Sequence, residues 1–563
     1  MRTIVKFCLY ILPVMLLLNL NKVQAQNTEA LLSAIEKEVE RNKTNLLIGN
    51  LQRSFFVSYA VVENKTLNIS ASLGALIQSS ENVNRRGFPN LLVGSYERNN
   101  IGYVDFNSFY GMRPYSSPIP LDNMESGITT VVWADLDKQY KKAAEAYEAK
   151  VAVISQQNLK EEDLNLPDFE KKAPVNLIMQ PTNMYMDKAY WENYARKASE
   201  VLSKYPDIIR SRVNVGLKNT MTYYYNTEQT RYAVPSTYYK VHLATTVLTD
   251  DGQEIMDDIY IEYPSFEEMP DLKSFTEICD SFAAHMMELR NAPLIDEAYT
   301  GPVLFEKMAV AEALQNHFLW NSLIAKKKKT GNEEVRNQMG GELAGNNLEE
   351  MTNKKIMSRS LSVISLSGSE SYEGKKLNGY FPIDAEGVVP AKELTLVENG
   401  VLRNMLNRRI PTRKNPNSNG HARFDESSLE LKTVPGNILL ASREACSNDE
   451  LKKRLLAAAK EEDLEYAYII RRLRGNSILS LYRVYVADGK EELVRGAEFS
   501  DFSMKSFKRV LGASNTNYFY NMAPSGPIST LVVPEGLLFE ELELAKNNNI
   551  QFKTPFIVAQ PNK

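Results

Sequence analysis

The sequence predicts an α+β fold with two domains, and three observations support this prediction. The chain has 563 residues, more than the roughly 250 to 300 residues that one hydrophobic core can serve. Its apolar share of 43% and charged share of 24% are ordinary for a folded globular protein. Helix-like and strand-like patterns alternate up to residue 292, and strand-like patterns dominate from residue 293 onward. We therefore expect an N-terminal α+β domain over 26–292 and a β-rich C-terminal domain over 293–563.

Residues 1–25 have the order of a secretory signal peptide. Basic residues precede the apolar run Phe7–Leu18, and the small residues Val23 and Ala25 precede an expected cut at Gln26. The run is shorter than the roughly 20 residues that span a bilayer. We expect an exported protein, periplasmic or extracellular, with no stable membrane anchor.

In the N-terminal domain, each predicted pair of strands is preceded and followed by a predicted helix along the sequence. Helical spacing occurs in 28–47, 135–157, 190–205 and 271–292, and strand-like patterns occur in 55–80, 90–106, 208–227 and 238–263. A turn at Glu63–Lys65 is expected to divide the first strand pair, and Asp250–Gly252 is a hairpin signal in the last. Residues 158–181 are rich in acids, Pro and Lys and predict a loop. Because helix followed by strands occurs twice, a duplicated α+β unit is one interpretation.

The C-terminal domain is predicted to be mainly strands around two helices. Residues 301–323 suggest a buried strand entering a helix, and 447–464 suggest a helix with Ser447 as N-cap and Glu450 at the capping-box position. Strands are expected in 359–368, 379–409, 466–475, 481–499 and 529–544.

Charge and cysteine content exclude two classes of protein. Loss of residues 1–25 would leave 63 basic against 70 acidic residues, so no strong electrostatic footprint for nucleic acid is expected. Only Cys279 and Cys446 would remain, which is not a disulfide scaffold. The sequence leaves open whether these two cysteines pair.

The histidines give few ways to build a metal site. A helical metal pair needs ligands at i and i+3 or i+4, and His317 has Ala313, Leu314, Trp320 and Asn321 at those positions. His285 has Glu288 at i+3, which near a helix end more often makes a surface hydrogen bond. The remaining two are also ordinary candidates, His242 in a strand and His421 in a turn. No Gly-x-Ser-x-Gly, Walker or dinucleotide motif is present.

Several phrases of the C-terminal half occur in one order that resembles the TldD/PmbA family. They are "YTGPVLFEKMAVAEAL", "GYFPIDAEGVVPAKELTLVENGVLRNMLNRRIPTR", "SNGHARF" and "VRGAEFSDFSMKSFKRVLGAS" followed by "VVPEGLLFEELEL". The N-terminal "NRRGFPNLLVGSYERNNIGYVDF" and "TTVVWADLDKQYKKAAEAYEAKVA" are similar to its exported, bacteroidete-type branch. The family was once named for modulation of DNA gyrase and is now regarded as metallopeptidases and their partners.

The resemblance implies a two-domain α+β subunit of a homodimer or heterodimer that encloses an inner cavity. In the family's active subunit, a His-Glu-x-x-x-His helix and a later cysteine hold a metal, and unfolded peptides are degraded. This chain has "EALQNHFLWN" at the helix position and no cysteine in "NTNYFYNMAPSGPIST". Cys446 does not match the family's position. The family phrase Asn-Ser-x-Gly-Thr is present only loosely, at 226–230.

The resemblance therefore predicts a subunit whose metal ligands are missing, with no catalytic residue and no cofactor. Its partner would be a second copy or a metal-bearing TldD-like chain. Residues expected to shape the cavity wall, or otherwise to form turns and satisfied carboxylates, are Asp384, Glu386, Gly387, Asn399, Gly400, Asn419, Gly420 and Arg423. One alternative is an active zinc peptidase with a non-standard site that uses His285, Glu288, His317 or His421. Another is an exported binding protein with no role in proteolysis.

Overall fold

The computed structural model describes residues 27–104, 116–156, 165–319, 322–331, 347–425, 430–475, 477–522, 529–548 and 550–552. The predicted signal peptide lies outside these residues, as do Trp320 and Asn321 of the predicted helix around His317. Among the described helices, none combines the length and the apolar character that a membrane span requires. Helices and strands are mixed in the N-terminal part and strands dominate the C-terminal part, as the α+β prediction requires.

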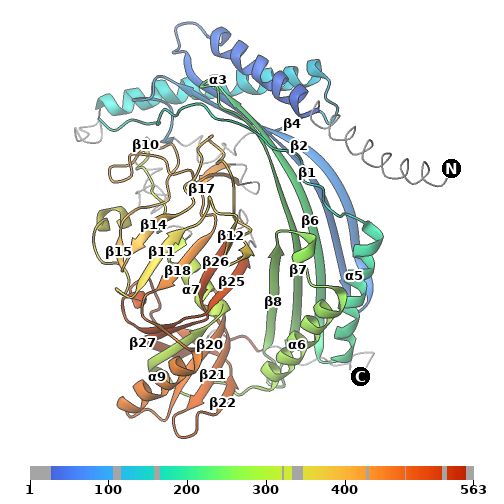
Figure 1. Cartoon of the computed structure of the whole chain (residues 1–563), viewed down its shortest axis with the longest axis vertical. Coiled ribbons are helices and arrows are strands. Elements are labelled where there is room, and N and C mark those ends of the chain that lie inside the picture. Colours follow the sequence, from blue (N-terminus) through green and yellow to red (C-terminus); the bar gives the residue numbers. More distant parts are fainter. Residues whose placement is uncertain are drawn as a thin grey trace, which may run out of the picture.

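A long curved sheet forms the N-terminal domain and arches over the C-terminal domain (Figure 1). Its strands lie in the order β4-β2-β1-β6-β7-β5, and β8 also pairs with β7. The bounds are β1 Ser54–Ser72, β2 Ala75–Val93, β4 Ser117–Pro118, β5 Asn176–Ile178, β6 Ile208–Asn226, β7 Arg231–Leu248 and β8 Glu254–Tyr263. A separate parallel pair is formed by β3 (Tyr103–Val104) and β10 (Thr330–Gly331).

The expected turn at Glu63–Lys65 is wrong, because β1 runs straight through these polar residues. Glu63 and Asn64 each have a partner on a neighbouring strand. Arg85 Nε donates to Glu63 Oε2 at 2.9 Å, and Thr220 Oγ1 donates to Asn64 Oδ1 at 2.7 Å. The chain turns instead at Leu73 and Gly74, whose φ values of 49° and 83° suit a two-residue hairpin turn. The Asp250–Gly252 turn joins β7 to β8 as predicted, with Leu248 opposite Glu254.

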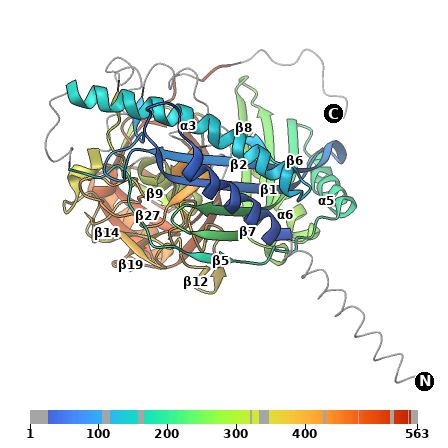
Figure 2. The same cartoon turned by 90° about the horizontal axis from the view of Figure 1, so that it is seen from above.

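Helices cover one face of this sheet at both ends. A helix over 27–45 and α3 (Glu125–Gln156) pack on β1, β2 and β6 around Val57, Tyr59 and Tyr140, and Figure 2 shows the two helices crossing the sheet together. The other end is covered by α5 (Lys188–Glu200), a short 3-10 turn over Val201–Lys204, and α6 (Leu272–Asn291). The order helix, strands, helix thus occurs twice, with β1 and β2 in the first set and β6, β7 and β8 in the second, and the antiparallel pairing of β1 with β6 places both sets in one sheet.

Two sheets make up the C-terminal domain. The first has the order β15-β14-β11-β18-β26-β25 and the second β19-β24-β27-β23-β21-β20-β9, with β22 on β21. The strands of the first are β11 Leu361–Ser365, β14 Leu394–Glu398, β15 Val401–Leu402, β18 Ile438–Ser442, β25 Asn517–Met522 and β26 Ser529–Pro534. Those of the second are β9 Tyr299–Glu306, β19 Ala445–Cys446, β20 Tyr466–Arg474, β21 Ser477–Tyr485, β22 Glu491–Val494, β23 Ala497–Phe499, β24 Val510–Ser514 and β27 Gly536–Lys546. Two small hairpins pair β12 (Ser371–Tyr372) with β13 (Lys375–Lys376) and β16 (Ala422–Asp425) with β17 (Glu430–Thr433).

The helix α7 (Met308–Leu314) lies in the core between these sheets, and its residues pack against both. A π-helical turn, η3 (Gln315–Leu319), continues it. The predicted helix after Ser447 is α9 (Asn448–Glu461), and the Ser447 hydroxyl accepts from Glu450 N as an N-cap. It covers the outer side of the second sheet through Leu451, Leu455 and Ala459.

Candidate functional site

The predicted cavity residues Asp384, Glu386 and Gly387 lie where the C-terminal domain meets the inner face of the N-terminal sheet. Ile383 packs with Val62, Phe88 and Tyr232 of that sheet in one cluster. Gly387 has φ +85°, and a Cβ there would lie 2.7 Å from Thr230 Cγ2. Glycine is therefore required by both the backbone conformation and the close contact of the two domains.

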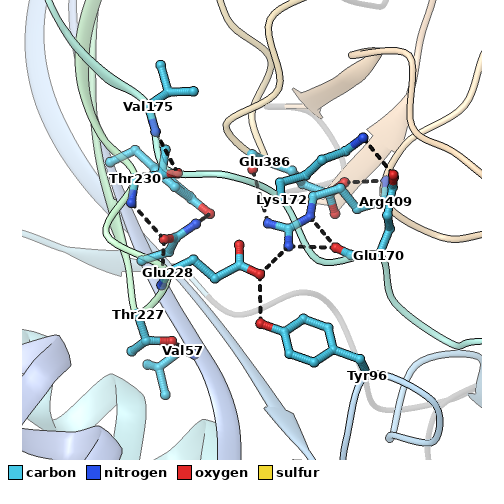
Figure 3. A network of polar contacts seen from close by, with 12 residues as sticks. Val57, Tyr96, Glu170, Lys172, Val175, Thr227, Glu228, Thr230, Glu386 and Arg409 are labelled. Carbon is cyan, nitrogen blue, oxygen red and sulfur yellow. Dashed lines mark hydrogen bonds and ion pairs between the residues drawn. The ribbon is translucent and has the colours of Figure 1, made fainter.

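Arg409 is the central side chain of this domain junction (Figure 3). It is fully buried, and its Nη2 donates to Glu228 Oε1 at 2.7 Å and to the Glu170 carbonyl at 2.6 Å. The guanidinium also stacks on Phe169 at 4.2 Å from the ring centre. Buried charge is stable only when paired and hydrogen bonded, and hydrogen bonding to Glu228 raises the pKa of Arg409 against the effect of burial. The N-terminal domain thus supplies every one of these partners.

Further polar groups extend this network on both sides. Tyr96 donates to Glu228 Oε1 at 2.7 Å, and burial together with this bond raises the pKa of its hydroxyl. Glu386 Oε2 accepts from Arg409 N at 2.8 Å, and Glu170 Oε2 accepts from Ser418 N at 2.6 Å. The two domains are therefore joined by side chains that the surrounding backbone holds in place.

Asp384 organises the loop that carries Glu386 and Gly387. Its carboxylate accepts from three backbone N–H groups, those of Glu386 at 2.9 Å, Val388 at 2.8 Å and Ala422 at 3.0 Å. Burial, with the nearby Glu386 charge, nevertheless raises the pKa of Asp384 to about 7. Both carboxylate oxygens of this buried residue therefore already accept hydrogen bonds from the backbone.

His421 is held by hydrogen bonds to both ring nitrogens. Nε2 lies 2.9 Å from Ser365 Oγ and 3.1 Å from Ser367 Oγ, and Nδ1 lies 2.8 Å from Asn419 Oδ1. Burial lowers the pKa of His421 to about 3, so the ring is neutral at ordinary pH. With both nitrogens engaged by neutral partners, His421 has no free lone pair directed at a metal.

The other predicted cavity residues form turns or pack beside His421. Arg423 stacks over Phe381 at 4.5 Å, and burial lowers its pKa to about 10. The exposed Asn399 and the buried Gly400, with φ 47° and 76°, make the β14–β15 turn, and Gly420 has φ 78°. A pocket beside α6 is lined by none of the eight predicted residues. Their role in the wall of an assembled cavity stays a prediction.

The peptidase helix expected from the family corresponds here to α7 and η3. Glu312, on α7, turns toward β20, where its Oε2 accepts from Leu473 N at 2.6 Å. Its Oε1 lies 3.8 Å from Arg472 Nε. His317 meets the Phe502 ring edge-on at 4.6 Å between centres, and its buried Nε2 has no hydrogen-bond partner in the described part of the chain.

These groups do not fit a zinc ion. Zinc sites use at least three protein ligands in one place, and no three His, Cys, Asp or Glu side chains of the described ranges are grouped in that way. The half-buried His285 has its Nδ1 3.8 Å from Oε2 of the exposed Glu288, and His242 lies between Asn214 and Asp258 in the sheet. Cys279 is buried and Cys446 half-buried, and both are free thiols.

Arg409, Glu228, Tyr96 and Glu170 were not predicted as site residues. Arg409 stands in the phrase "NMLNRRIPTR" and Glu228 in the loosely matching segment 226–230, so each was near a recognised pattern. Nothing in one sequence pairs residues that far apart along the chain.

Comparisons with known proteins agree with this architecture. Residues 298–546 match the family described as the PmbA/TldA metallopeptidase C-terminal domain. No curated protein matches the chain.

Three solved structures are similar to most of the chain. A candidate modulator of a DNA gyrase from Thermotoga maritima shares 14% identity and a TM-score of 0.57, covering 87% of this chain and 96% of that one. TldE from Thermococcus kodakarensis shares 12% identity and a TM-score of 0.56, covering 91% and 100%. A candidate modulator of DNA gyrase from Bacteroides thetaiotaomicron shares 11% identity and a TM-score of 0.54, covering 92% and 99%.

At these identities the structural likeness concerns the fold alone, and the family is indicated by the C-terminal match. The expected two-domain α+β fold is confirmed. Residues 298–546 thus match the PmbA/TldA metallopeptidase C-terminal domain family, and most of the chain shares its fold with the three solved structures.

Proposed function

We propose that this chain is a non-catalytic subunit of a TldD/PmbA-type assembly, in which it forms one wall of a cavity that holds or helps to degrade unfolded peptides. In the form of the proposal that includes catalysis, the partner is a related chain that carries the metal ligands, and a second copy would form only a peptide-holding cavity. The main support for this proposal is how the side chains of Glu312 on α7 and His317 on η3 are placed. Glu312 is engaged by β20, and His317 faces an aromatic ring where the peptidase would present ligands.

The domain junction also supports a wall-forming role. Arg409, Glu228 and Glu386 are each less than 7% exposed in their side chains, and they tie the loops of one domain to the sheet of the other. Buried ionic groups that are hydrogen bonded across two domains favour one arrangement of those domains. A subunit that forms the wall of a cavity but catalyses no reaction needs its two domains to be held in one fixed arrangement.

The proposal includes export, which rests on the sequence pattern of residues 1–25. In that compartment the chain would meet unfolded exported proteins. The gyrase name of similar proteins gives no support for a nucleic-acid partner, because the formal net charge of this chain is −4.

The test is purification of the untagged chain from its native envelope, with metal content measured on the complex and on the isolated chain. We expect a related chain with His-Glu-x-x-x-His to co-purify and to carry the zinc, while the isolated chain carries none. Cleavage of an unfolded polypeptide should then require that partner.

Two outcomes would contradict the proposal. One equivalent of zinc on the isolated chain, with chelator-sensitive cleavage, would establish the alternative of an active peptidase with a non-standard site. A purified chain that is metal-free and has no metal-bearing partner would favour the binding protein without a role in proteolysis.

A further inference from the structure

A pocket of about 850 Å³ lies between α6 of the N-terminal domain and strands β20, β21 and β25 of the C-terminal domain. Small-molecule sites commonly have volumes of roughly 300 to 1,000 Å³. In Figure 1, α6 and β8 stand beside these strands, so the pocket opens between the two domains. It is separate from the Arg409 junction, which shares none of its lining residues.

The walls of this pocket are mainly apolar and aromatic. This apolar surface comes from Ile259, Ile278, Phe282, Met308, Tyr482 and Tyr518, and polar or charged residues complete the lining. On α6, positions 274, 278, 281 and 285 follow helical spacing, so one stripe of the helix faces the pocket. Apolar walls with a few polar groups are the usual form of a site for a small organic ligand.

Most of the charged groups in the pocket are already paired. Arg472 Nη2 lies 3.2 Å from Asp257 Oδ1, and Arg471 Nε donates to Glu306 Oε2 at 2.8 Å. Glu277, at the exposed rim, has Lys273 at 3.9 Å. These pairs leave Lys307 as the lining cation with no carboxylate of the described residues within ion-pair distance. The charge of Lys307 helps to lower the pKa of Glu535, but the Glu535 carboxylate already accepts hydrogen bonds from Asn448 and Thr516 at 2.8 and 2.9 Å.

Lys307 is also held in a strained backbone conformation. Its φ of 47° and ψ of −106° are rare for a residue with a side chain. Its N–H donates to the Glu535 carbonyl at 2.7 Å, which holds the backbone in place between β9 and α7. Strained non-glycine residues cluster at binding and catalytic sites, because a functional side chain justifies the strain.

We propose that this pocket binds a carboxylate with an apolar body, and that Lys307 pairs with the carboxylate while the α6 face and the tyrosine rings cover the apolar part. His285 contributes a neutral polar group, because burial lowers its pKa. The same chemistry is offered by a medium-chain fatty acid and by a small apolar amino acid with a free carboxylate. This binding does not depend on the proposed function, since the pocket uses none of the groups that would replace the metal site.

Isothermal titration calorimetry on the mature chain tests the proposal with octanoate and N-acetyl-phenylalanine, each beside its neutral counterpart, octanol and N-acetyl-phenylalaninamide. We expect one or both carboxylates to bind one-to-one and their neutral counterparts to bind at least about tenfold more weakly, as loss of a charge-assisted hydrogen bond implies. Binding of octanoate alone would mark a lipid-derived ligand, and binding of the acetylated amino acid alone would mark one derived from peptides.

Three variants test whether the carboxylate binds in this pocket and pairs with Lys307. Lys307→Gln keeps a side chain of similar shape at the strained position and should weaken carboxylate binding about tenfold. Lys453→Gln, on exposed α9, should leave it unchanged. Ser281→Trp places a large ring over the pocket from an exposed position of α6 and should abolish binding while the melting temperature is kept.

The proposal is overturned if neither carboxylate binds, if Lys307→Gln binds as tightly as Lys453→Gln, or if Ser281→Trp binds normally. Metal content and partner co-purification remain separate measurements, so failure here leaves the proposed subunit role unaffected.

Discussion

Two clusters of charged residues join the domains, and they differ in how completely their central arginine is hydrogen bonded. At the first, Arg409 is buried among Glu228, the Glu170 carbonyl and the Phe169 ring, and each of its neighbours is bonded in turn. At the second, Arg472 of β20 lies between Asp257 of β8 and Glu312 of α7.

The arginine of the second cluster is less completely bonded. Arg472 Nε has no hydrogen-bond partner in the described ranges, whereas Nε, Nη1 and Nη2 of Arg409 all donate. Burial also raises the pKa of both acids of the second cluster, that of Glu312 to about 8. A fully bonded arginine fixes one geometry, whereas a cluster whose acids have raised pKa values responds to pH. The Arg409 cluster therefore sets how the domains meet, and the Arg472 cluster beside the pocket is the adaptable contact.

The largest expected effect is that of Arg409→Ala. It leaves Glu228 buried without its cation, and breaking a buried pair in this way typically costs about 3–5 kcal/mol. Chemical denaturation of the variant should show this loss in the free energy of unfolding. The exposed Arg403→Ala, which removes bonds to Glu398 and Asn353, should cost less than about 1 kcal/mol. Equal losses in the two variants would contradict the comparison.

Gly387→Ala should be the next most damaging change, because it strains the same junction without altering charge. The new Cβ would lie 2.7 Å from Thr230 Cγ2 at a φ of +85°, and we expect a loss of roughly 1–3 kcal/mol. A double variant with Thr230→Ser, which removes the clashing methyl group, should recover part of the loss in denaturation experiments. No recovery would mean that backbone strain alone accounts for the effect.

The sequence predicted those elements whose signals are local. The helix α6 begins and ends within a residue of its predicted range, because Asp271 caps it and its apolar residues are periodic. The strand β1 was divided wrongly because Glu63 and Asn64 look like turn residues until their partners Arg85 and Thr220 are known.

Site residues were harder to predict than the elements that carry them. Asp384, Glu386 and Gly387 were recognised as a motif, but their roles depend on Thr230 and Arg409. Contacts between distant segments form only in the fold, and hydrophobic periodicity carries no information about them. The same holds for Lys307, whose strained φ has no signature in the sequence.

Glu312→Gln sharpens the contrast in pH response. The folded-state pKa of about 8 exceeds the ordinary value of 4.5, so the fold favours the protonated acid. The stability that this preference contributes is complete below the ordinary value and is lost as pH rises through about 8. The melting temperature of the variant, measured against wild type in the same buffers, should match it near the ordinary pKa and exceed it increasingly up to about 8. A difference that does not vary with pH would contradict the assignment.

The smallest expected effect is that of His317→Phe, and it addresses the helix where a peptidase would hold its metal. The His317 ring already meets Phe502 edge-on, and its buried Nε2 lacks a partner, so a phenyl ring replaces it without loss of a bond. We expect the free energy of unfolding to change by less than about 1 kcal/mol, in the stabilising direction. Zinc content of the chain and of any complex should stay the same. Loss of bound zinc from the variant would instead make His317 a ligand, and because the described residues near it supply no second ligand, the rest of that site would have to come from a partner chain.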